Sequence, residues 1–360
     1  MSRFNKKILI LFILLFATLG ATLLWLCVPF IDRSARGSNP VPLQVSDTAI
    51  SSAQTARLTE FIENEAAGTD ALIALKDGKI IFEYGPTDVP SNLHSGRKSI
   101  ISLLYGIASQ KGLVNVQSTL GKLGIDEART PLTDMEKTAT VAHLLQARSG
   151  VYLASGAETK EMKDGRPFRG QFAPGENYYY NNWDFNVAGA IFEQQTGLTI
   201  GQAIEDWLAR PMGMQDFHPS HVVYDSDTTS TEYRTYRIHM SARDLAKLGR
   251  LVQQKGDWYG TQIVPADWIS LTTRPTSGLR SRAYDGYGYL WWLNSERDII
   301  AADGWGGQYL HVDRNGPFVV VNRQDTGNSK FGYLLFVYPS HSDDPLDVYK
   351  IHDILSGRAP

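Results

Sequence analysis

Ser95-Gly96-Arg97-Lys98, followed by SIISLLYGIASQKGLV over residues 99–114, is the stretch that decides our interpretation of the fold. Apolar residues recur at helical spacing behind it, at Ile100, Ile101, Leu104 and Ile107. The pattern predicts a helix that Ser95 opens. Residues three apart share one face of a helix, so Lys98 could reach back to the Ser95 hydroxyl. Because a serine hydroxyl becomes a good nucleophile when a neighbouring base takes its proton, the spacing makes Ser95 and Lys98 a candidate catalytic pair.

Two later patches could complete such a site. Tyr180 and Asn182 lie in an aromatic run that would serve equally well as a core cluster. The residues Trp305-Gly306-Gly307 could simply form a tight turn before a strand. Glycines there would also let the backbone approach a substrate closely, and the N–H group of Gln308 could then join that of Ser95 in an oxyanion hole.

The residue types leave two routes open for the proton. Lys98 could act as the base if burial or a neighbouring cation kept its amine neutral. Alternatively, a charged Lys98 could stabilise Tyr180 as a phenolate that acts as the base. The sequence does not choose between these routes.

Strand patterns lie at both ends of the chain, around a helical middle. Two β-prone runs, 71–75 and 79–84, meet at Asp77-Gly78, which is a strong hairpin signal. Helices are predicted at 53–66, 137–148, 185–196, 201–210 and 347–355, and late strands at 287–293, 298–302, 308–312, 318–322 and 332–337. This order predicts an α+β fold in which one mixed, antiparallel sheet is flanked by helices and a helical subdomain, about 95–235, is inserted.

Seven segments of the chain resemble, in order, parts of the serine β-lactamase and penicillin-binding-protein superfamily. The similarity is to the class C β-lactamase-like branch, which includes esterases and nylon-oligomer hydrolases, and it covers the chain from about residue 50 onward. The segments are SGRKSIISLLYGIASQKGLV, VAHLLQARSGV, PGENYYYNNWDFNVAG, ARPMGM, MSARDLAKLG, YGYLWW and GWGGQYLHVD.

The resemblance implies a β-lactamase/transpeptidase-like fold and a role for each motif residue. Ser95 would be the acylated nucleophile, Lys98 a proton shuttle, and Tyr180 a general base and later an acid. Asn182 would contact the substrate or Lys98. Trp305, Gly306 and Gly307 would occupy the place of the family's Lys-Thr-Gly motif.

That last match departs from the family pattern, because Trp305 offers only an apolar face and an N–H donor where the family's lysine helps to hold a substrate carboxylate. The departure argues against an efficient β-lactamase. We therefore expect a Ser-Lys-Tyr esterase or amidase that acts through an acyl-enzyme. An aromatic-lined acyl pocket is one expectation, although the core is the favoured place for each of its candidate residues: Trp183, Tyr287, Trp291 and Trp292.

Other functions remain open at this stage. The chain could be a D-alanyl-D-alanine carboxypeptidase, a β-lactamase, or a penicillin-binding sensor that stays acylated. The expected substrate is a small ester, amide or peptide-like molecule, with no metal and no cofactor. The composition of 42% hydrophobic and 20% charged residues is that of a globular protein, and the formal net charge of -3 argues against nucleic acid as a partner.

The N-terminus differs in character from the rest. Residues 8–31 carry no charge, and about 24 residues at about 1.5 Å each would span a bilayer as a helix. We expect residues 1–7 in the cytoplasm, 8–31 as a transmembrane signal anchor, 32–50 as a linker and 51–360 as a serine hydrolase domain on the periplasmic side of a bacterial-type cytoplasmic membrane. A cleaved signal peptide is the alternative.

Overall fold

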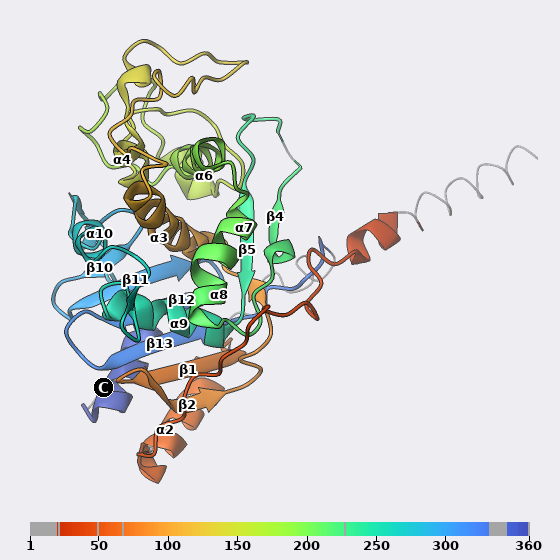
Figure 1. The fold of residues 1–360 in the computed structure, drawn as a ribbon, viewed down its shortest axis with the longest axis vertical. Coiled ribbons are helices and arrows are strands. Elements are labelled where there is room, and N and C mark those ends of the chain that lie inside the picture. Colours follow the sequence, from red (N-terminus) through yellow and green to blue (C-terminus); the bar gives the residue numbers. More distant parts are fainter. Residues whose placement is uncertain are drawn as a thin grey trace, which may run out of the picture.

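The computed structural model describes residues 20, 22–48, 50–66, 68–226, 228–330 and 344–358. Its centre is a sheet of eight strands in the order β2-β1-β13-β12-β11-β10-β9-β8 (Figure 1). The strands are β1 Ala71–Lys76, β2 Lys79–Tyr84, β8 Ser277–Gly278, β9 Gly286–Tyr287, β10 Trp292–Asn294, β11 Ile299–Gly304, β12 Gln308–Asp313 and β13 Phe318–Arg323. Two small sheets, β3-β5-β4 and β6-β7, accompany it.

The sheet joins the two ends of the domain. β1 pairs with β13 from Ala71↔Arg323 to Lys76↔Phe318, although the strands are far apart in the sequence. The β1–β2 hairpin turns at Asp77 and Gly78, both with positive φ, as the Asp-Gly signal predicts. Every strand pair of this sheet is antiparallel among the described residues, so the expectation of a mixed sheet was wrong.

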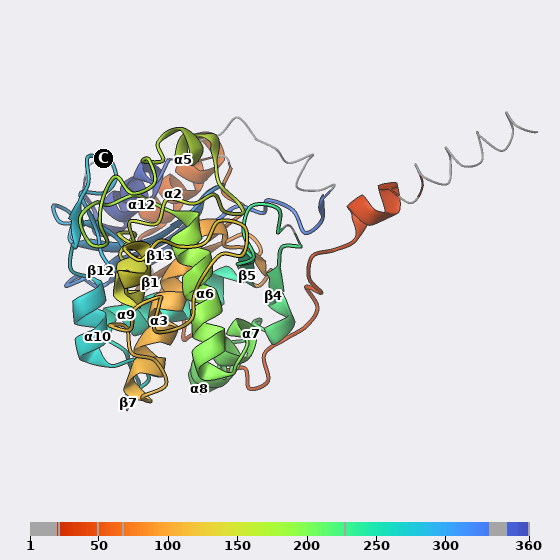
Figure 2. The same ribbon diagram turned by 90° about the horizontal axis from the view of Figure 1, so that it is seen from above.

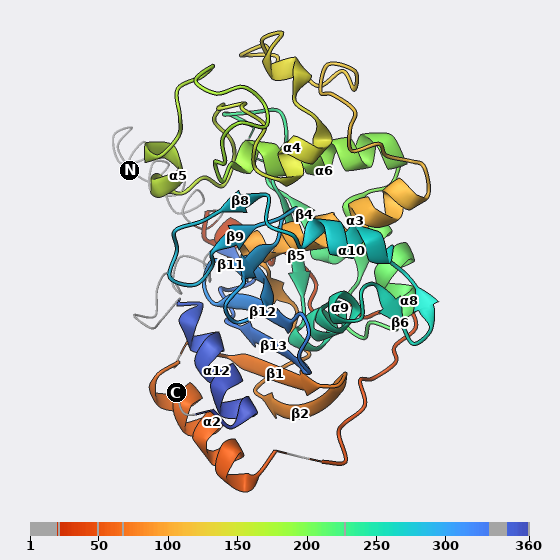
Figure 3. The same ribbon diagram turned by 90° about the vertical axis from the view of Figure 1, so that its left-hand side faces the viewer.

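Helices cover both faces of the sheet. On one face, α2 (Ser52–Asn64) and α12 (Leu346–Ser356) lie together over an apolar layer (Figure 3). On the other face, α9 (Ala242–Gln253) packs against β13, β12 and β1, and α3 (Arg97–Gln110) lies beside α10 (Ala266–Thr272). The indole N–H of Trp268 in α10 donates to the Ser102 carbonyl of α3 at 2.9 Å. The long helix α3 is thereby fixed in the interior.

Most of the helical region lies beyond one edge of the sheet, and its last helix reaches down beside α9 (Figure 1). It contains α4 (Val141–Leu145), α5 (Lys160–Asp164), α6 (Asn182–Thr196), α7 (Ile200–Ile204) and α8 (Arg210–Met212). The helix predicted over 137–148 is shorter than expected: α4 ends near Gln146, and Ala147 takes a left-handed φ of 55°.

One predicted strand is interrupted. The run 287–293 divides into β9 and β10, because Leu290 has a φ of 66° and the Gly288 N–H donates to the Trp291 carbonyl in a tight turn. The strand predicted at 332–337 lies outside the described residues.

Most of the predicted anchor, 8–31, also falls outside the residues that the structure describes. Within the described part, no helix is both long and apolar enough to cross a membrane. The predicted linker runs along the domain, past α8 (Figure 2). Its backbone bonds to the domain, with the Gly37 N–H on the Gln215 carbonyl at 3.1 Å and the Val41 N–H on the Gly213 carbonyl at 2.9 Å.

Candidate active site

Ser95 lies in a short turn that leads directly into α3. The turn, His94–Gly96, follows β3 (Ser91–Asn92), which pairs with β5 (Tyr236–Met240). His94 has a φ of 46°, and its N–H donates to Asn92 Oδ1 at 3.0 Å. This left-handed step turns the chain sharply between the strand and the helix and places Ser95 at the entrance of α3.

Lys98 is the centre of the site. Its side chain is buried, with only 2% of the residue exposed. Its amine lies 2.9 Å from Ser95 Oγ and 2.6 Å from the Tyr180 hydroxyl. The same nitrogen sits 4.2 Å from the ring centre of Tyr180 and 4.4 Å from that of Phe185. Residues from two separate parts of the sequence therefore meet as a hydroxyl, an amine and a phenol.

Burial acts on both titrating groups in the same direction, toward neutrality. Desolvation lowers the pKa of Lys98 well below 10.5, and the charge of Arg97 adds to that effect. Desolvation also raises the pKa of Tyr180, although a hydrogen bond with Ser95 opposes the rise. The arrangement thus favours a neutral amine beside a protonated phenol over an ammonium beside a phenolate.

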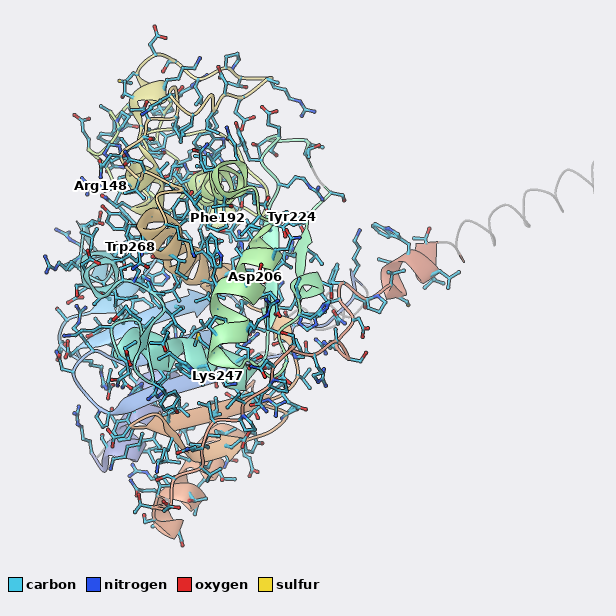
Figure 4. The ribbon with its side chains drawn as sticks, in the orientation of Figure 1. Arg148, Phe192, Asp206, Tyr224, Lys247 and Trp268 are labelled. Carbon is cyan, nitrogen blue, oxygen red and sulfur yellow. The ribbon has the colours of Figure 1, made fainter. Side chains whose placement is uncertain are left out.

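Tyr180 is held by the start of α6 and by the loop before it. Asn181 caps α6 by accepting the Trp183 N–H on Oδ1 at 3.2 Å, while its Nδ2 donates to the Val151 carbonyl at 2.7 Å. The Arg148 guanidinium donates to the Gly175 carbonyl at 2.9 Å and to the Thr276 carbonyl, also at 2.9 Å. Figure 4 shows Arg148 below α4, on the side of the helical region that faces the sheet.

Asn182, the first residue of α6, lines the cavity that contains Ser95. Its Nδ2 donates to the Ala157 carbonyl at 2.6 Å. Its Oδ1 is buried and has no hydrogen-bond partner among the described residues. Asn182 therefore presents a free acceptor at the site, a position that suits a contact with a bound donor.

Residues 305–307 form the loop between β11 and β12. Gly306 and Gly307 both have a φ of 74°, which favours glycine. The Trp305 ring lies edge-on to the His94 ring, with the centroids 5.0 Å apart. A Cβ placed on Gly304, just before the loop, would lie 2.2 Å from the Leu93 carbonyl oxygen and 3.0 Å from the Gly96 nitrogen. The end of β11 thus touches the turn that carries Ser95.

Gln308 approaches this turn through its backbone, not its side chain. The side-chain amide donates to the Gly306 carbonyl at 2.6 Å and the Gln324 carbonyl at 2.7 Å. Its oxygen accepts from Arg323 Nε at 2.6 Å. The Gln308 side chain therefore organises the loop from within, and only its N–H group remains a candidate for substrate contact.

A cavity of about 590 Å³ opens at Ser95. Its lining is largely polar and comes from the region of the nucleophile turn, residues 157–162, Asn182, the start of β5 and Trp305. The aromatic pocket expected from the sequence is not formed by the residues considered for it. Trp183, Tyr287 and Trp291 are buried in the core, and Trp292 packs against the Tyr180 ring at 5.2 Å between centroids.

Several residues that line the cavity were not predicted from the sequence. Arg97 and Arg237 line the cavity, as does the segment 157–162 with Glu158 and Lys160. Arg97 could have been predicted as a site residue, because it is a charged residue inside the Ser-x-x-Lys motif. The other residues could not have been predicted from the sequence, since only tertiary folding brings them close to Ser95.

The chain matches a model of the Beta-lactamase family over residues 55–327. It therefore belongs to the Beta-lactamase family, in agreement with the resemblance of its motifs. The chain is 23% identical to the 6-aminohexanoate-dimer hydrolase of Paenarthrobacter ureafaciens, over 71% of this chain and 72% of that protein.

Solved structures share the fold. A putative beta-lactamase from Bacteroides dorei superimposes with a TM-score of 0.61 at 15% identity, covering 86% of this chain and all of the other. A putative 6-aminohexanoate-dimer hydrolase from Bacillus anthracis gives a TM-score of 0.59 at 15% identity, covering 91% of this chain and 89% of the other.

Proposed function

We propose that this protein is a serine hydrolase that cleaves an ester or amide through an acyl-enzyme on Ser95. The observation that carries the proposal is the position of the Lys98 amine, 2.9 Å from the Ser95 hydroxyl and 2.6 Å from the Tyr180 hydroxyl. A buried amine with a lowered pKa is a base that is ready at moderate pH. Of the two proton routes, this supports Lys98 as the acylation base.

In acylation, the Ser95 oxygen bonds to the substrate carbonyl carbon while its proton passes to Lys98. The resulting oxyanion would accept from the N–H groups of Ser95 and Gln308. As the intermediate collapses, the bond to the leaving group breaks. Tyr180 gives its proton to the leaving atom and takes one from Lys98. Water then attacks the acyl carbon, with the proton transfers reversed, and releases the acid and free Ser95.

Labelling tests this proposal. The hydrolase domain is treated with a fluorophosphonate and its mass is measured, and p-nitrophenyl esters, nitrocefin and labelled penicillin are compared as substrates. We expect one phosphonyl group on Ser95, none on Ser95→Ala, and fast turnover of esters. Stable labelling by penicillin without turnover would instead indicate a sensor. A protein in which no reagent modifies Ser95 would contradict the proposed hydrolase.

We also propose, from the sequence, that residues 8–31 anchor the protein in a cytoplasmic membrane with the hydrolase domain outside. The support is an uncharged run preceded by Arg3, Lys6 and Lys7. Membrane fractionation and N-terminal sequencing test it. A soluble protein with a trimmed N-terminus would refute the anchor without affecting the assignment of the hydrolase.

A further inference from the structure

Arg97 is a buried cation at the wall of the active-site cavity. Only 4% of the residue is exposed, and it lines the same cavity as Ser95. Its guanidinium donates to the His94 carbonyl at 3.1 Å and to Asn186 Oδ1 at 3.4 Å, and it lies 4.8 Å from the ring centre of Tyr236. Of its other N–H groups, the one on Nε is buried without a hydrogen-bond partner among the described residues.

Arg97 also lacks the carboxylate partner that its neighbours have. In the same cavity wall, Arg237 binds Asp225 through two hydrogen bonds of 2.6 and 2.9 Å. Glu158 pairs with Arg166, and Lys160 pairs with Asp164. The fifth charged lining residue, Glu161, is exposed. Within the described part of the chain, no carboxylate lies within ion-pair distance of Arg97.

A buried guanidinium that has no carboxylate in ion-pair contact and an unpaired Nε–H is costly to the fold unless something binds it. Planar N–H donors match the two oxygens of a carboxylate. Asn182 Oδ1, also buried without a partner, lines the same cavity and would accept from an N–H or O–H of the same molecule. These two residues would together suit a ligand that carries both an anionic group and an N–H or O–H donor.

We propose that Arg97 binds a carboxylate group of the substrate, so that the hydrolase prefers anionic esters or amides. The inference rests on the proposed function, because it specifies the substrate of that same site. It also assigns to Arg97 the role of anion recognition, in a site where Trp305 provides no cation.

The test compares matched esters in the intact hydrolase. Mono-p-nitrophenyl glutarate carries the carboxylate on the acyl part, and p-nitrophenyl valerate is its neutral counterpart. A second pair, 4-(butyryloxy)benzoate and its methyl ester, places the charge on the leaving group. We expect kcat/KM to favour the anionic member of one pair by about tenfold or more, as a hydrogen bond to a charged group would give. The favoured pair identifies which side of the scissile bond faces Arg97.

Substitutions separate recognition from folding. Arg97→Gln should lose the preference, and Arg97→Lys should restore part of it. Because the Arg97 charge also lowers the pKa of Lys98, which affects both esters alike, the readout is the ratio of the two kcat/KM values and not either rate alone. Arg234→Gln is the matched control, because Arg234 is an exposed arginine that does not line the cavity. In the unmodified protein, raising the ionic strength should lower kcat/KM for the anionic ester alone.

Equal rates for anionic and neutral esters, or an equal loss on both in Arg97→Gln, would overturn the inference and assign Arg97 a purely structural role. Those outcomes leave the hydrolase intact. The failure of Ser95 to react with any ester or with a fluorophosphonate would instead refute the proposed function itself.

Discussion

At the scale of single residues, the chemistry depends on the burial of Lys98. An exposed lysine is almost wholly charged near neutral pH and cannot accept a proton from serine. Here the amine lies between two hydroxyl groups and against two aromatic rings, so water does not stabilise its charge. The resemblance to the family pointed to Tyr180, and the Ser-x-x-Lys spacing predicted only the Ser95 partner. It could not predict the burial, which comes from Tyr180 and Phe185.

Lys98→Arg tests the need for a neutral amine. Arginine keeps the positive charge but does not lose its proton in proteins, so the variant retains electrostatics without a base. We expect kcat/KM for an ester to fall by about 100- to 10,000-fold, the usual range for general acid–base catalysis. Circular dichroism would check that the fold is kept. A variant with nearly full activity would show that Lys98 does not need to be neutral and would favour the phenolate route.

The pH dependence of the reaction rate follows from the lowered pKa of Lys98. Acylation requires neutral Lys98, and the neutral fraction grows as pH rises through its folded-state pKa. Because burial places that pKa below the ordinary 10.5, kcat/KM should rise with pH and level off well before pH 10.5. Rates corrected for spontaneous ester hydrolysis measure this. A rise that continues to about pH 10.5 would mean that Lys98 titrates as an exposed lysine.

At the scale of elements, local signals explain what could be predicted. The Asp77-Gly78 pair was sufficient to predict the β1–β2 hairpin, because the turn depends on these two adjacent residues. The sequence did not reveal that the strand predicted at 287–293 is interrupted, because Leu290 adopts a left-handed conformation that its residue type does not favour. The sequence also did not reveal that the Gln308 side chain organises the loop 305–307, since its partner Arg323 comes from the next strand.

Gly304→Ala should disturb the site from β11. The new methyl group would meet the Leu93 carbonyl at 2.2 Å and push the strand away from the turn that carries Ser95. We expect a loss of about 1–3 kcal/mol in the free energy of unfolding, typical of overpacking, together with a marked fall in kcat. Urea unfolding and ester kinetics measure the two effects.

Gly278→Ala in β8 is the matched control for that variant. Gly278 also lies in a strand of the same sheet, but a Cβ there would meet nothing within 4 Å. It should change stability and kcat little. If Gly304→Ala behaved like this control, the end of β11 would not be as tightly packed against the nucleophile turn as the structure has it.

At the scale of the whole molecule, the segment before residue 50 belongs to the packing of the domain. Leu43 is buried, the Ser46 N–H donates to the Ile80 carbonyl at 2.8 Å, and Lys247 Nζ donates to the Val41 carbonyl at 2.7 Å. Its Pro- and Gly-containing composition predicted a linker, since composition reports a lack of regular structure and not a lack of contacts. The order of strands and helices predicted the sheet with its helical insertion, because that order decides which elements can pair.

Removing this segment should destabilise the domain. A chain that starts at residue 50 loses these hydrogen bonds and the burial of Leu43, whereas one that starts at residue 29 keeps them. We expect the shorter chain to be less stable by about 2 kcal/mol or more, since each lost bond contributes about 1 kcal/mol. Urea denaturation of both chains measures the difference. Equal midpoints and slopes would show that the segment adds nothing to stability.

The start of the segment before residue 50 is hydrogen-bonded to a loop close to the nucleophile turn. The Phe30 N–H donates to the Asn328 carbonyl at 2.6 Å, and Arg33 grips Asp325 with two bonds of 2.7 Å. Between these two anchoring points, the Thr326 hydroxyl meets the His94 imidazole at 2.9 Å, one residue from Ser95. Residues 30–33 are thus tied to the loop 325–328 by several hydrogen bonds and do not run freely past it. A pull on residues 30–33 would therefore act, through the loop that holds Asp325 and Thr326, on His94 and so on the turn that carries Ser95.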